Sequence, residues 1–317
     1  MAQQGFRHEA LFYSGGDRFL AGTLPFMEEA VAQGEPIMVA VDAEAIELLK
    51  GSLNGAAHRV LFADMRELGA NPALIISAWQ DFVAEHAGSG RPVRGIGEPV
   101  WPESTPAELA ECERHESLLN LAFERGPSWR LLCPYDAAAL GSSVLRAAEH
   151  NHPVIREHGA ERESHAYREP LAAGAPLAGA LPNPANPPDE LSFDSPDDLE
   201  QVRRFVADHA PAEGTDPDRV DGLVLAVDEV VTNTLRHGGG RGVVRAWSEN
   251  GGVVCEVSDA GTISDPLVGR IRPDLERPEG RGLWIANHFC DLVQIRSSPA
   301  GTVVRCHLGP TGSRVPA

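Results

Sequence analysis

Three polar side chains recur at every fourth position of one apolar segment, at Glu229, Asn233 and His237. Residues 216–237 have the apolar spacing of a buried helix, so this interval stacks the three polar groups along one helical face. A carboxylate one turn from a carboxamide can orient a water molecule or a hydroxyl group beside a metal ion. The competing interpretation is the solvated face of a half-exposed helix. We favour a site, because polar groups on an apolar helix are costly to bury.

Two further elements of the carboxy-terminal half could contribute to the same site. Asp259 follows an expected strand at the point where the chain turns, so its carboxylate can accept a hydrogen bond from an exocyclic amine. The segment Gly280-Arg281-Gly282-Leu283 leads into an expected helix, whose first backbone N–H groups can bind an anion. Such a glycine–arginine–glycine segment by itself is usually a flexible turn. The order and spacing of the elements together predict a binding site.

A second group of candidate residues lies in the amino-terminal half. Glu98, Trp101, Tyr135 and Asp136 come just after expected strands. Ligands of parallel sheets bind at the carboxyl ends of the strands, so we expect these four residues to line a site for a small ligand. The Ser-Gly-Gly-Asp loop at residues 14–17 lacks the Gly-Lys-Ser/Thr sequence that grips phosphate and metal, which argues against a nucleotide there.

The elements of the amino-terminal half alternate between short apolar runs and helical patterns. We expect strands at residues 10–13, 36–41, 59–62, 93–96 and 130–133. We expect helices at residues 17–32, 43–53, 72–86, 106–123 and 136–148. Strict alternation predicts a mainly parallel sheet with helices on both faces, which is a three-layer α/β fold.

Two polar features of this half are assigned to the fold rather than to a site. Glu116 and Asn120 share a face of the expected helix at residues 106–123, but no second metal-binding element is apparent, so we favour a hydrogen-bonding scaffold. Cys133 lies in an expected strand, where a thiol is more often core than reactive.

The carboxy-terminal half has a different order of elements. We expect strands at residues 191–193, 242–248, 252–258, 292–296 and 303–308. We expect helices at residues 196–209, 216–237 and 283–290, the first with Ser195 as its cap. Helices grouped on one face of a mainly antiparallel sheet predict a two-layer α/β sandwich.

Composition limits the functions that the chain can have. Its 317 residues, 42% hydrophobic and 23% charged, suggest two globular domains. A net charge of −19 argues against direct nucleic-acid binding. We find neither a signal segment nor an apolar run that could span a membrane. The five cysteines lack metal-ligand spacing, so we expect reduced thiols in a cytoplasmic protein.

A proline- and alanine-rich stretch separates the two halves. Prolines within it block both helix and central strand, so residues 169–190 are expected to form a semi-rigid linker. This gives a domain at residues 1–168 and a second domain at residues 191–317.

Five separated motifs make residues 6–155 resemble the MEDS sensory domain of methanogen, methylotroph and dichloromethane-responsive regulators. The motifs are RHEALFYSGGDRFL, FADMRELGANPALII, RGIGEPVW, AECERHESLLNLAF and LLCPYDAAAL. The resemblance implies a RecA/KaiC-like domain that has lost its phosphate loop, and a role in sensing a small molecule.

Residues 191–309 resemble the GHKL, or Bergerat-type, ATPases, and among them the anti-sigma-factor serine kinases. The resemblance implies binding of ATP with Mg²⁺, Glu229 being the general base and Asn233 the Mg²⁺ ligand. It implies that Asp259 binds the adenine amino group, that Gly261 lets the ring approach, and that Thr302 supports this contact. The phosphate-binding residues it implies are Gly280, Arg281, Gly282 and Leu283.

The resemblance also implies partners, and it leaves alternatives open. A sigma factor, an antagonist of the anti-sigma factor, or both would bind, and a homodimer is compatible with it. The first glycine box often reads Asp-x-Gly-x-Gly, but Ile263 stands at the second glycine. A nucleotide-gated partner-binding module without phosphotransfer is therefore one alternative. The other is a sensor histidine kinase with His165 as phosphoacceptor, disfavoured because the proline-rich stretch follows it.

Overall fold

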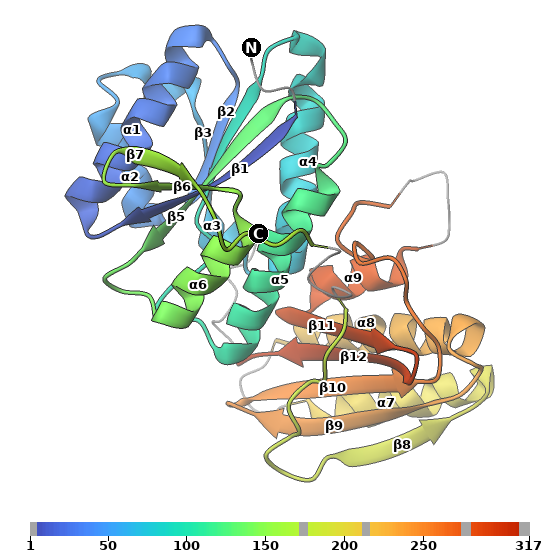
Figure 1. The fold of residues 1–317 in the computed structure, drawn as a ribbon. Coiled ribbons are helices and arrows are strands. Elements are labelled where there is room, and N and C mark those ends of the chain that lie inside the picture. Colours follow the sequence, from blue (N-terminus) through green and yellow to red (C-terminus); the bar gives the residue numbers. More distant parts are fainter. Residues whose placement is uncertain (1–4, 171–176, 211–215, 274–279, 311–317) are drawn as a thin grey trace. The chain divides into compact units, whose positions relative to one another are not determined.

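The chain divides into two compact units, residues 1–174 and 175–317, and each has a sheet of its own (Figure 1). No helix in the part of the chain described below is both long and apolar enough to cross a membrane. The computed structural model describes residues 5–170, 177–210, 216–273 and 280–310.

The amino-terminal unit is built on a seven-stranded sheet in the order β3-β2-β4-β5-β1-β6-β7. Neighbouring strands are parallel, except that β7 is antiparallel to β6. The mainly parallel sheet that the sequence predicts is thereby confirmed. The strands are β1 (Phe6–Tyr13), β2 (Ile37–Val41), β3 (Leu61–Asp64), β4 (Val93–Gly97), β5 (Trp129–Asp136), β6 (Val154–Glu157) and β7 (Ala160–Glu163).

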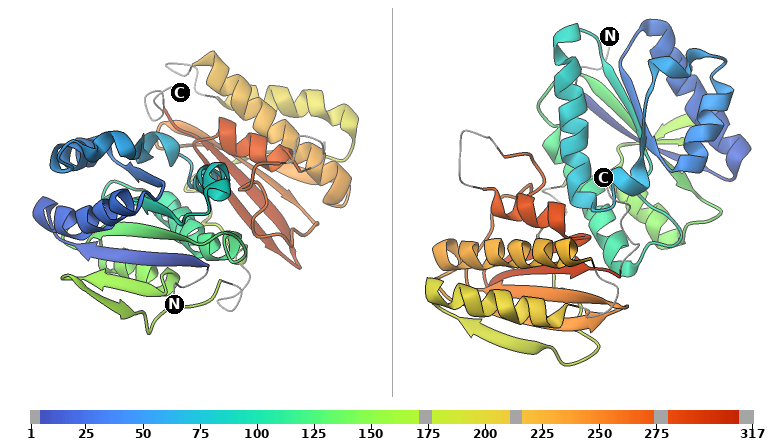
Figure 2. Two further views of the ribbon diagram at one scale, coloured as in Figure 1. Left: turned by 90° about the horizontal axis from the view of Figure 1, so that it is seen from above. Right: turned by 180° about the vertical axis from the view of Figure 1, so that it is seen from behind.

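Helices cover both faces of this sheet (Figure 2). On one face, Phe26 of α1 and Leu49 of α2 pack against buried strand residues. On the other face, the Trp79 ring of α4 lies so close to Gly95 that a Cβ there would come within 2.7 Å of it. The helices are α1 (Gly16–Gln33), α2 (Ala43–Ser52), α3 (Met65–Leu68), α4 (Ile75–His86), α5 (Pro106–Ala122) and α6 (Ser142–Asn151), with 3-10 turns at Ala56–Arg59, Pro72–Leu74 and Ala87–Ser89.

The helix expected at residues 136–148 is wrong in its first half. β5 continues to Asp136, and α6 begins only at Ser142. Tyr135 and Asp136 pair with the end of β1, and the Asp136 carboxylate accepts a hydrogen bond from the backbone N–H of Ala138 at 2.9 Å. Strand pairing and this turn therefore override the helical spacing. The hairpin of β6 and β7 was not expected, because β7 is short and fully exposed.

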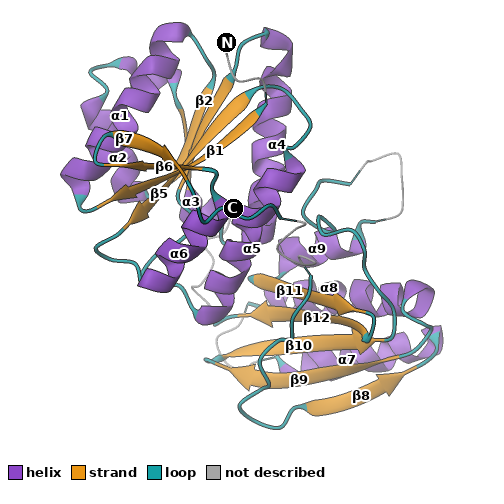
Figure 3. Cartoon of the chain, viewed as in Figure 1, coloured by secondary structure: helices purple, strands orange, loops and turns teal. Residues whose placement is uncertain are grey.

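The carboxy-terminal unit has two layers (Figure 3). Its sheet is antiparallel, in the order β11-β12-β10-β9-β8. The strands are β8 (Asp189–Phe193), β9 (Gly242–Glu249), β10 (Gly252–Asp259), β11 (Leu292–Ser298) and β12 (Gly301–Leu308). The helices are α7 (Leu199–His209), α8 (Pro217–His237) and α9 (Gly282–Phe289), with a 3-10 turn at Pro196–Asp198. The predicted two-layer sandwich is confirmed.

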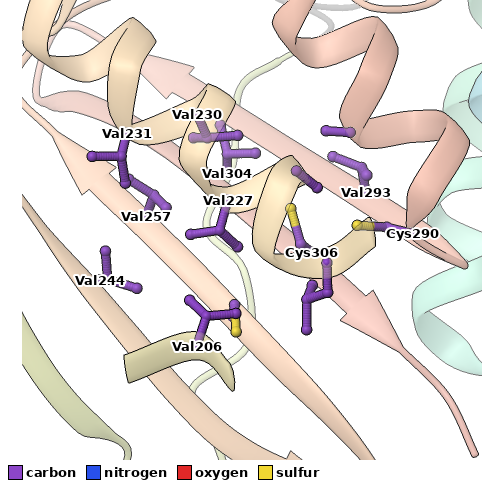
Figure 4. Close-up of a cluster of buried hydrophobic side chains, with 14 of the residues drawn as sticks. Val206, Val227, Val230, Val231, Val244, Val257, Cys290, Val293, Val304 and Cys306 are labelled. Atoms are coloured by element: carbon purple, nitrogen blue, oxygen red, sulfur yellow. The ribbon is translucent and has the colours of Figure 1, made fainter. Parts of the chain in front are cut away.

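The core of this unit lies between the helices and the sheet, and it is rich in valine (Figure 4). Val227, Val230 and Val231 of α8 face Val244 of β9 and Val257 of β10, and all five are buried. These side chains fix the rotation of α8 about its axis, because the helix can bury only one apolar face. The rotation in turn decides where the polar residues of α8 point.

Part of the expected linker packs on the carboxy-terminal unit. Residues 177–184, called the covering segment here, cross the face of the sheet away from the helices (Figure 1). The Leu177 carbonyl accepts the backbone N–H of Ser297 at 2.9 Å, and the Pro182 carbonyl accepts Arg305 Nη2 at 3.0 Å. Residues 171–176 of the expected linker lie outside the described residues.

Candidate functional site

Helix α8 holds the polar residues that the sequence singled out. The Asp216 carboxylate caps it by accepting the backbone N–H of Asp218 at 3.0 Å, and Pro217 occupies its first turn. Glu229 and Asn233 are half-buried beside the apolar face, whereas His237 is exposed. The first two therefore border the core, and the third lies in solvent.

Gly282, the first residue of α9, lies directly against these two side chains. A Cβ on Gly282 would come within 2.7 Å of Asn233 Nδ2 and 2.9 Å of Glu229 Oε2. The positive end of α9 therefore lies beside a carboxylate and a carboxamide that are one turn apart on α8. Any side chain at position 282 would displace one of them.

The carboxylate of Asp259, at the end of β10, is held by two hydrogen bonds. The Thr234 hydroxyl donates to Oδ2 at 2.7 Å, and the backbone N–H of Gly261 donates to Oδ1 at 2.7 Å. Thr234 directly follows Asn233 on α8, so the first bond fixes Asp259 relative to that residue. A carboxylate has four lone-pair sites, so Asp259 retains capacity to accept a further donor.

The loop after β10 is tied down by hydroxyl groups. Thr302 Oγ1 donates to the Gly261 carbonyl at 2.9 Å, and it lies 2.9 Å from Ser297 Oγ. Ser297 Oγ in turn accepts the backbone N–H of Ile263 at 2.8 Å. The two hydroxyls thus link β11 and β12 to the loop that carries Gly261.

The remaining sequence-predicted residues lie at the start of α9. Gly280 has a φ of +83°, which favours glycine, and Arg281 is half-buried. The Leu283 side chain belongs to the apolar core, so only its backbone amide can face a ligand. The preceding residues 274–279 lie outside the described part of the chain.

The residues on these elements have donor and acceptor types that match Mg²⁺-ATP. Asp259 can accept from an amino group, while the Asn233 carboxamide oxygen suits a hard cation such as Mg²⁺. The N–H groups at the start of α9 suit phosphate oxygens. At Gly261 and Gly282 a Cβ would fill the space beside these groups. The hydrogen-bonding groups and the two glycine positions therefore fit the nucleotide.

In the amino-terminal unit, three of the four sensor-ligand candidates line one cavity of about 500 Å³. Glu98, Trp101 and Asp136 come from the carboxyl ends of β4 and β5 or the loops that follow, and Gly15 and Gly16 also line the cavity. The guanidinium carbon of Arg66 lies 4.8 Å from the centre of the Trp101 ring. This cavity lies where parallel sheets bind ligands.

Glu98 is the most perturbed acid in this cavity. Burial raises the pKa of its carboxyl group to about 7, and the charges of Asp42 and Asp136 add to the rise. Tyr13 opposes it by donating a hydrogen bond to Glu98 Oε1 at 2.7 Å. Burial and the charge of Glu98 likewise raise the pKa of the Tyr13 phenol. Glu98 can therefore change charge near neutral pH.

Tyr135 does not join the other three candidates. It is 2% exposed and lines a separate cavity of about 280 Å³ with Glu116 of α5 and Ala148 of α6. Successive strand residues point to opposite faces of a sheet. Tyr135 therefore points under α5 and α6, whereas Asp136, the last residue of β5, lines the larger cavity.

Both units match known families. Residues 7–153 match the MEDS family, described as the methanogen/methylotroph, DcmR sensory domain. Residues 194–308 match the histidine kinase-like ATPase domain. The chain joins a MEDS domain to a histidine kinase-like ATPase domain.

A likeness to one solved structure is much weaker. The RsbU and RsbW domains of a protein from Mycobacterium tuberculosis are 21% identical to this chain, with a TM-score of 0.31. The likeness covers 42% of this chain and 35% of the other. No curated protein matches this chain.

In the sequence, His165 follows the MEDS match and precedes the ATPase match. It is exposed in a turn after β7, and residues 164–170 form no helix. The sequence disfavoured His165 as a phosphoacceptor because a proline-rich stretch follows it. A phosphoacceptor histidine would need a helical hairpin, which this described stretch does not provide.

Proposed function

We propose that the chain is a cytoplasmic signalling regulator in which a small-molecule sensor controls an ATP-dependent serine/threonine protein kinase domain of the anti-sigma-factor type. The two domain matches support the combination of a sensory domain with a kinase-like domain. The observation that carries the kinase proposal is the contact of Gly282 with both Glu229 and Asn233. This approach supports the proposal because it brings a carboxylate, a carboxamide and a helix amino terminus together.

Each residue of the ATPase domain has a role in this proposal. Asn233 holds Mg²⁺ through its carboxamide oxygen. Asp259 accepts the adenine amino group, Gly261 leaves room for the ring, and Thr302 holds the Gly261 carbonyl in place. The phosphate oxygens are bound by backbone groups and a guanidinium at Gly280, Arg281, Gly282 and Leu283.

Phosphotransfer in this site depends on positioning and on one proton acceptor. Bound ATP supplies the phosphoryl group, and its Mg²⁺ neutralises phosphate charge. Glu229 accepts the proton of a serine or threonine hydroxyl on the partner protein. The amino terminus of α9 holds negative charge in place. The substrate is an antagonist of an anti-sigma factor, the kinase domain also binds a sigma factor, and the active form is a homodimer.

The sensor acts by shifting the balance between two conformational states of the kinase domain. A ligand in the cavity lined by Glu98, Trp101 and Asp136 shifts this balance only if it binds one state more tightly than the other. The reciprocal effect is required: partner or nucleotide binding must change the affinity for the sensed ligand by the same factor.

Calorimetry with Mg²⁺-ATP on the full chain tests the nucleotide site. We expect saturable binding that Asn233→Ala abolishes or weakens at least about 10-fold, equivalent to about 1.4 kcal/mol. Asp228→Asn is the matched control: Asp228 lies on the same helix but pairs with Arg203 of α7 at 2.8 Å. Absence of binding by the wild-type chain, or equal binding by Asn233→Ala, would contradict the proposal.

A nucleotide-gated partner-binding module is the second candidate, and Ile263 favours it. Ile263 stands where the second glycine is often found, its N–H is held by Ser297, and its side chain packs against the core. The loop is therefore anchored at this point. Incubation of the full chain with labelled ATP and an antagonist protein distinguishes the two functions. Serine phosphate that disappears in Glu229→Gln supports the kinase, whereas ATP-dependent capture without phosphate supports the module.

A further inference from the structure

Four buried side chains meet inside the MEDS domain, remote in sequence from one another. They are His8 of β1, Glu116 of α5, Cys133 of β5 and His152, the residue that ends α6. Each is at most 2% exposed. One nitrogen, oxygen or sulfur atom from each lies within 4.8 Å of the others. Two imidazoles, a thiol and a carboxylate are the common donors of transition-metal sites.

The distances between these donor atoms suit a single ion. Glu116 Oε2 lies 3.1 Å from His8 Nε2 and 3.0 Å from His152 Nε2. Cys133 Sγ lies 3.4 Å from His8 Nε2. A tetrahedral ion with bonds of about 2.0–2.3 Å needs neighbouring ligands about 3.3–3.8 Å apart. These three distances are within a few tenths of an ångström of that spacing, and the other pairs of donor atoms lie within 4.8 Å of one another.

The outer nitrogens of both imidazoles are fixed as donors. His152 Nδ1 lies 2.8 Å from the Ala148 carbonyl oxygen, which can only accept. His8 Nδ1 lies 3.2 Å from Asn120 Oδ1. Asn120 is oriented this way because its Nδ2 donates to the carbonyls of Glu116 and Asn151. Metal-binding histidines typically donate their other ring N–H in this manner.

This arrangement leaves the inner nitrogens with their lone pairs. In a neutral ring protonated at Nδ1, Nε2 is an acceptor, and it faces the acceptor oxygens of Glu116. In the described residues, the Glu116 oxygens and His152 Nε2 make no hydrogen bond. The weakly donating Cys133 thiol, which lies against His8 Nε2, is the one proton donor among the four groups. Buried acceptors that face one another are unfavourable, and a cation among them removes that cost.

We infer that His8, Glu116, Cys133 and His152 form a binding site for a divalent transition-metal ion of the zinc class. The Glu116 carboxylate and the Cys133 thiolate balance the two positive charges, so the filled site is neutral within a buried environment. The thiol proton leaves to solvent on binding. The set of two nitrogens, one sulfur and one oxygen completes a four-coordinate shell.

One ligand also faces a cavity. Glu116 lines the cavity of about 280 Å³ beside Tyr135, whose other walls include Leu109, Val144 and Ala147. This cavity offers the ion a path to the site past Glu116. It also places the ion next to a mainly apolar space, so a small molecule there would contact the metal or its carboxylate ligand.

Metal analysis and Co²⁺ titration of the full chain test this site. We expect about one equivalent of tightly held transition metal in chain purified without chelator. Co²⁺ added to the metal-free chain should give the near-ultraviolet charge-transfer band of a thiolate ligand and the visible bands of a tetrahedral ion. Mg²⁺ at the ATPase domain gives neither signal, so the two sites are distinguished. A wild-type chain without stoichiometric metal and without the thiolate band would overturn the inference.

Substitutions test which side chains bind the metal ion. Cys133→Ser should remove the thiolate band, whereas Cys112→Ser should keep it. Cys112 is also buried in this domain, but its thiol donates to the Pro99 carbonyl, which a serine hydroxyl can do too. Asn120→Leu keeps all four donors and should weaken metal binding about 10- to 100-fold. A thiolate band that survives in Cys133→Ser would contradict the assignment, whether or not that variant is fully stable.

Discussion

Gly261 and Gly238 are in backbone contact where the loop after β10 crosses the end of α8. A Cβ on Gly261 would lie 2.7 Å from Gly238 Cα, and a Cβ on Gly238 would lie 2.5 Å from Asp259 Oδ2. The two glycines therefore allow the end of α8 to lie against the Asp259 carboxylate, which Thr234, the residue after Asn233, also binds. The glycine that leaves room for an adenine ring in the proposed site also leaves room for the helix.

Gly261→Ala is expected to destabilise the carboxy-terminal unit by about 1–3 kcal/mol, because the added methyl group forces the two backbones apart. Denaturant unfolding measures the loss, and hydrogen exchange of α8 and β10 locates it. Gly51→Ala is the control. A Cβ at that helical position meets nothing within 4 Å, so the stability should be equal or slightly higher. If Gly261→Ala had unchanged stability, Gly261 and Gly238 would not be in close backbone contact.

Glu229→Gln should separate binding from chemistry. We expect it to retain Mg²⁺-ATP affinity within a few-fold and to lower the rate of serine phosphorylation about 10²- to 10⁴-fold, because the proton acceptor is lost. Phosphorylation of an antagonist protein over time provides the rate. The neighbouring Asp228→Asn, which faces Arg203, should keep the wild-type rate. Equal rates in both variants would remove Glu229 from the chemistry.

Glu98 should make the MEDS domain less stable as the pH rises. The pKa of the Glu98 carboxyl group is about 7 in the folded protein, whereas its ordinary value is 4.5. The folded state therefore binds the proton more tightly than the unfolded state does. Stability is therefore full below pH 4.5 and falls as the pH rises through 7, by up to about 3 kcal/mol. Unfolding of wild type and Glu98→Gln across this range measures the difference. The exposed Glu44→Gln variant, from the same cavity, should follow the wild type.

Glu9 is expected to be essential for the stability of the amino-terminal sheet. It is fully buried, and its oxygens lie 2.9 Å from Arg130 Nε and 2.5 Å from Arg156 Nε. Burial alone would raise the pKa of Glu9, but these arginines and Arg7 hold it below its ordinary value. Glu9→Gln should cost up to about 3–5 kcal/mol, because it removes the buried charge that three half-buried guanidinium groups share.

Denaturant unfolding at pH 7 measures the effect of Glu9→Gln. The cost should shrink as the pH falls below the ordinary range of a carboxyl group, because the wild-type residue then also loses its charge. Glu47→Gln, on an exposed residue of α2 that pairs with Lys50, should change stability by less than about 0.5 kcal/mol. A similar small change for Glu9→Gln would show that the arginines are neutralised by other groups.

The periodic parts of the fold were predictable from the sequence. Apolar spacing located α8 and α5, and the alternation of strands and helices predicted the parallel sheet, because both patterns report burial directly. The start of α6 was missed because Pro134 to Asp136 pair with a strand more than 120 residues away. Local spacing carries no information about such pairing.

The two candidate sites differ in how far the sequence could reveal them. Glu229 and Asn233 are four residues apart on one helix, so their proximity follows from helical geometry. The four ligands of the proposed metal site come from separate elements, and their convergence depends on how β1 and β5 pair beneath α5 and α6. Cys133 was therefore assigned to the core, and Glu116 to a hydrogen-bonding scaffold.

The covering segment decides where the chain can be divided for separate study. Leu177 is 5% exposed within the core of the carboxy-terminal unit, and Arg305 binds both the Pro182 carbonyl and Glu256. A fragment that starts at residue 191 would lose these contacts and the first two residues of β8, which uncovers the edge of β9 at Arg245 and Ala246 and invites aggregation. A fragment that starts a few residues before Leu177 keeps them, so the kinase-like half should be excised there.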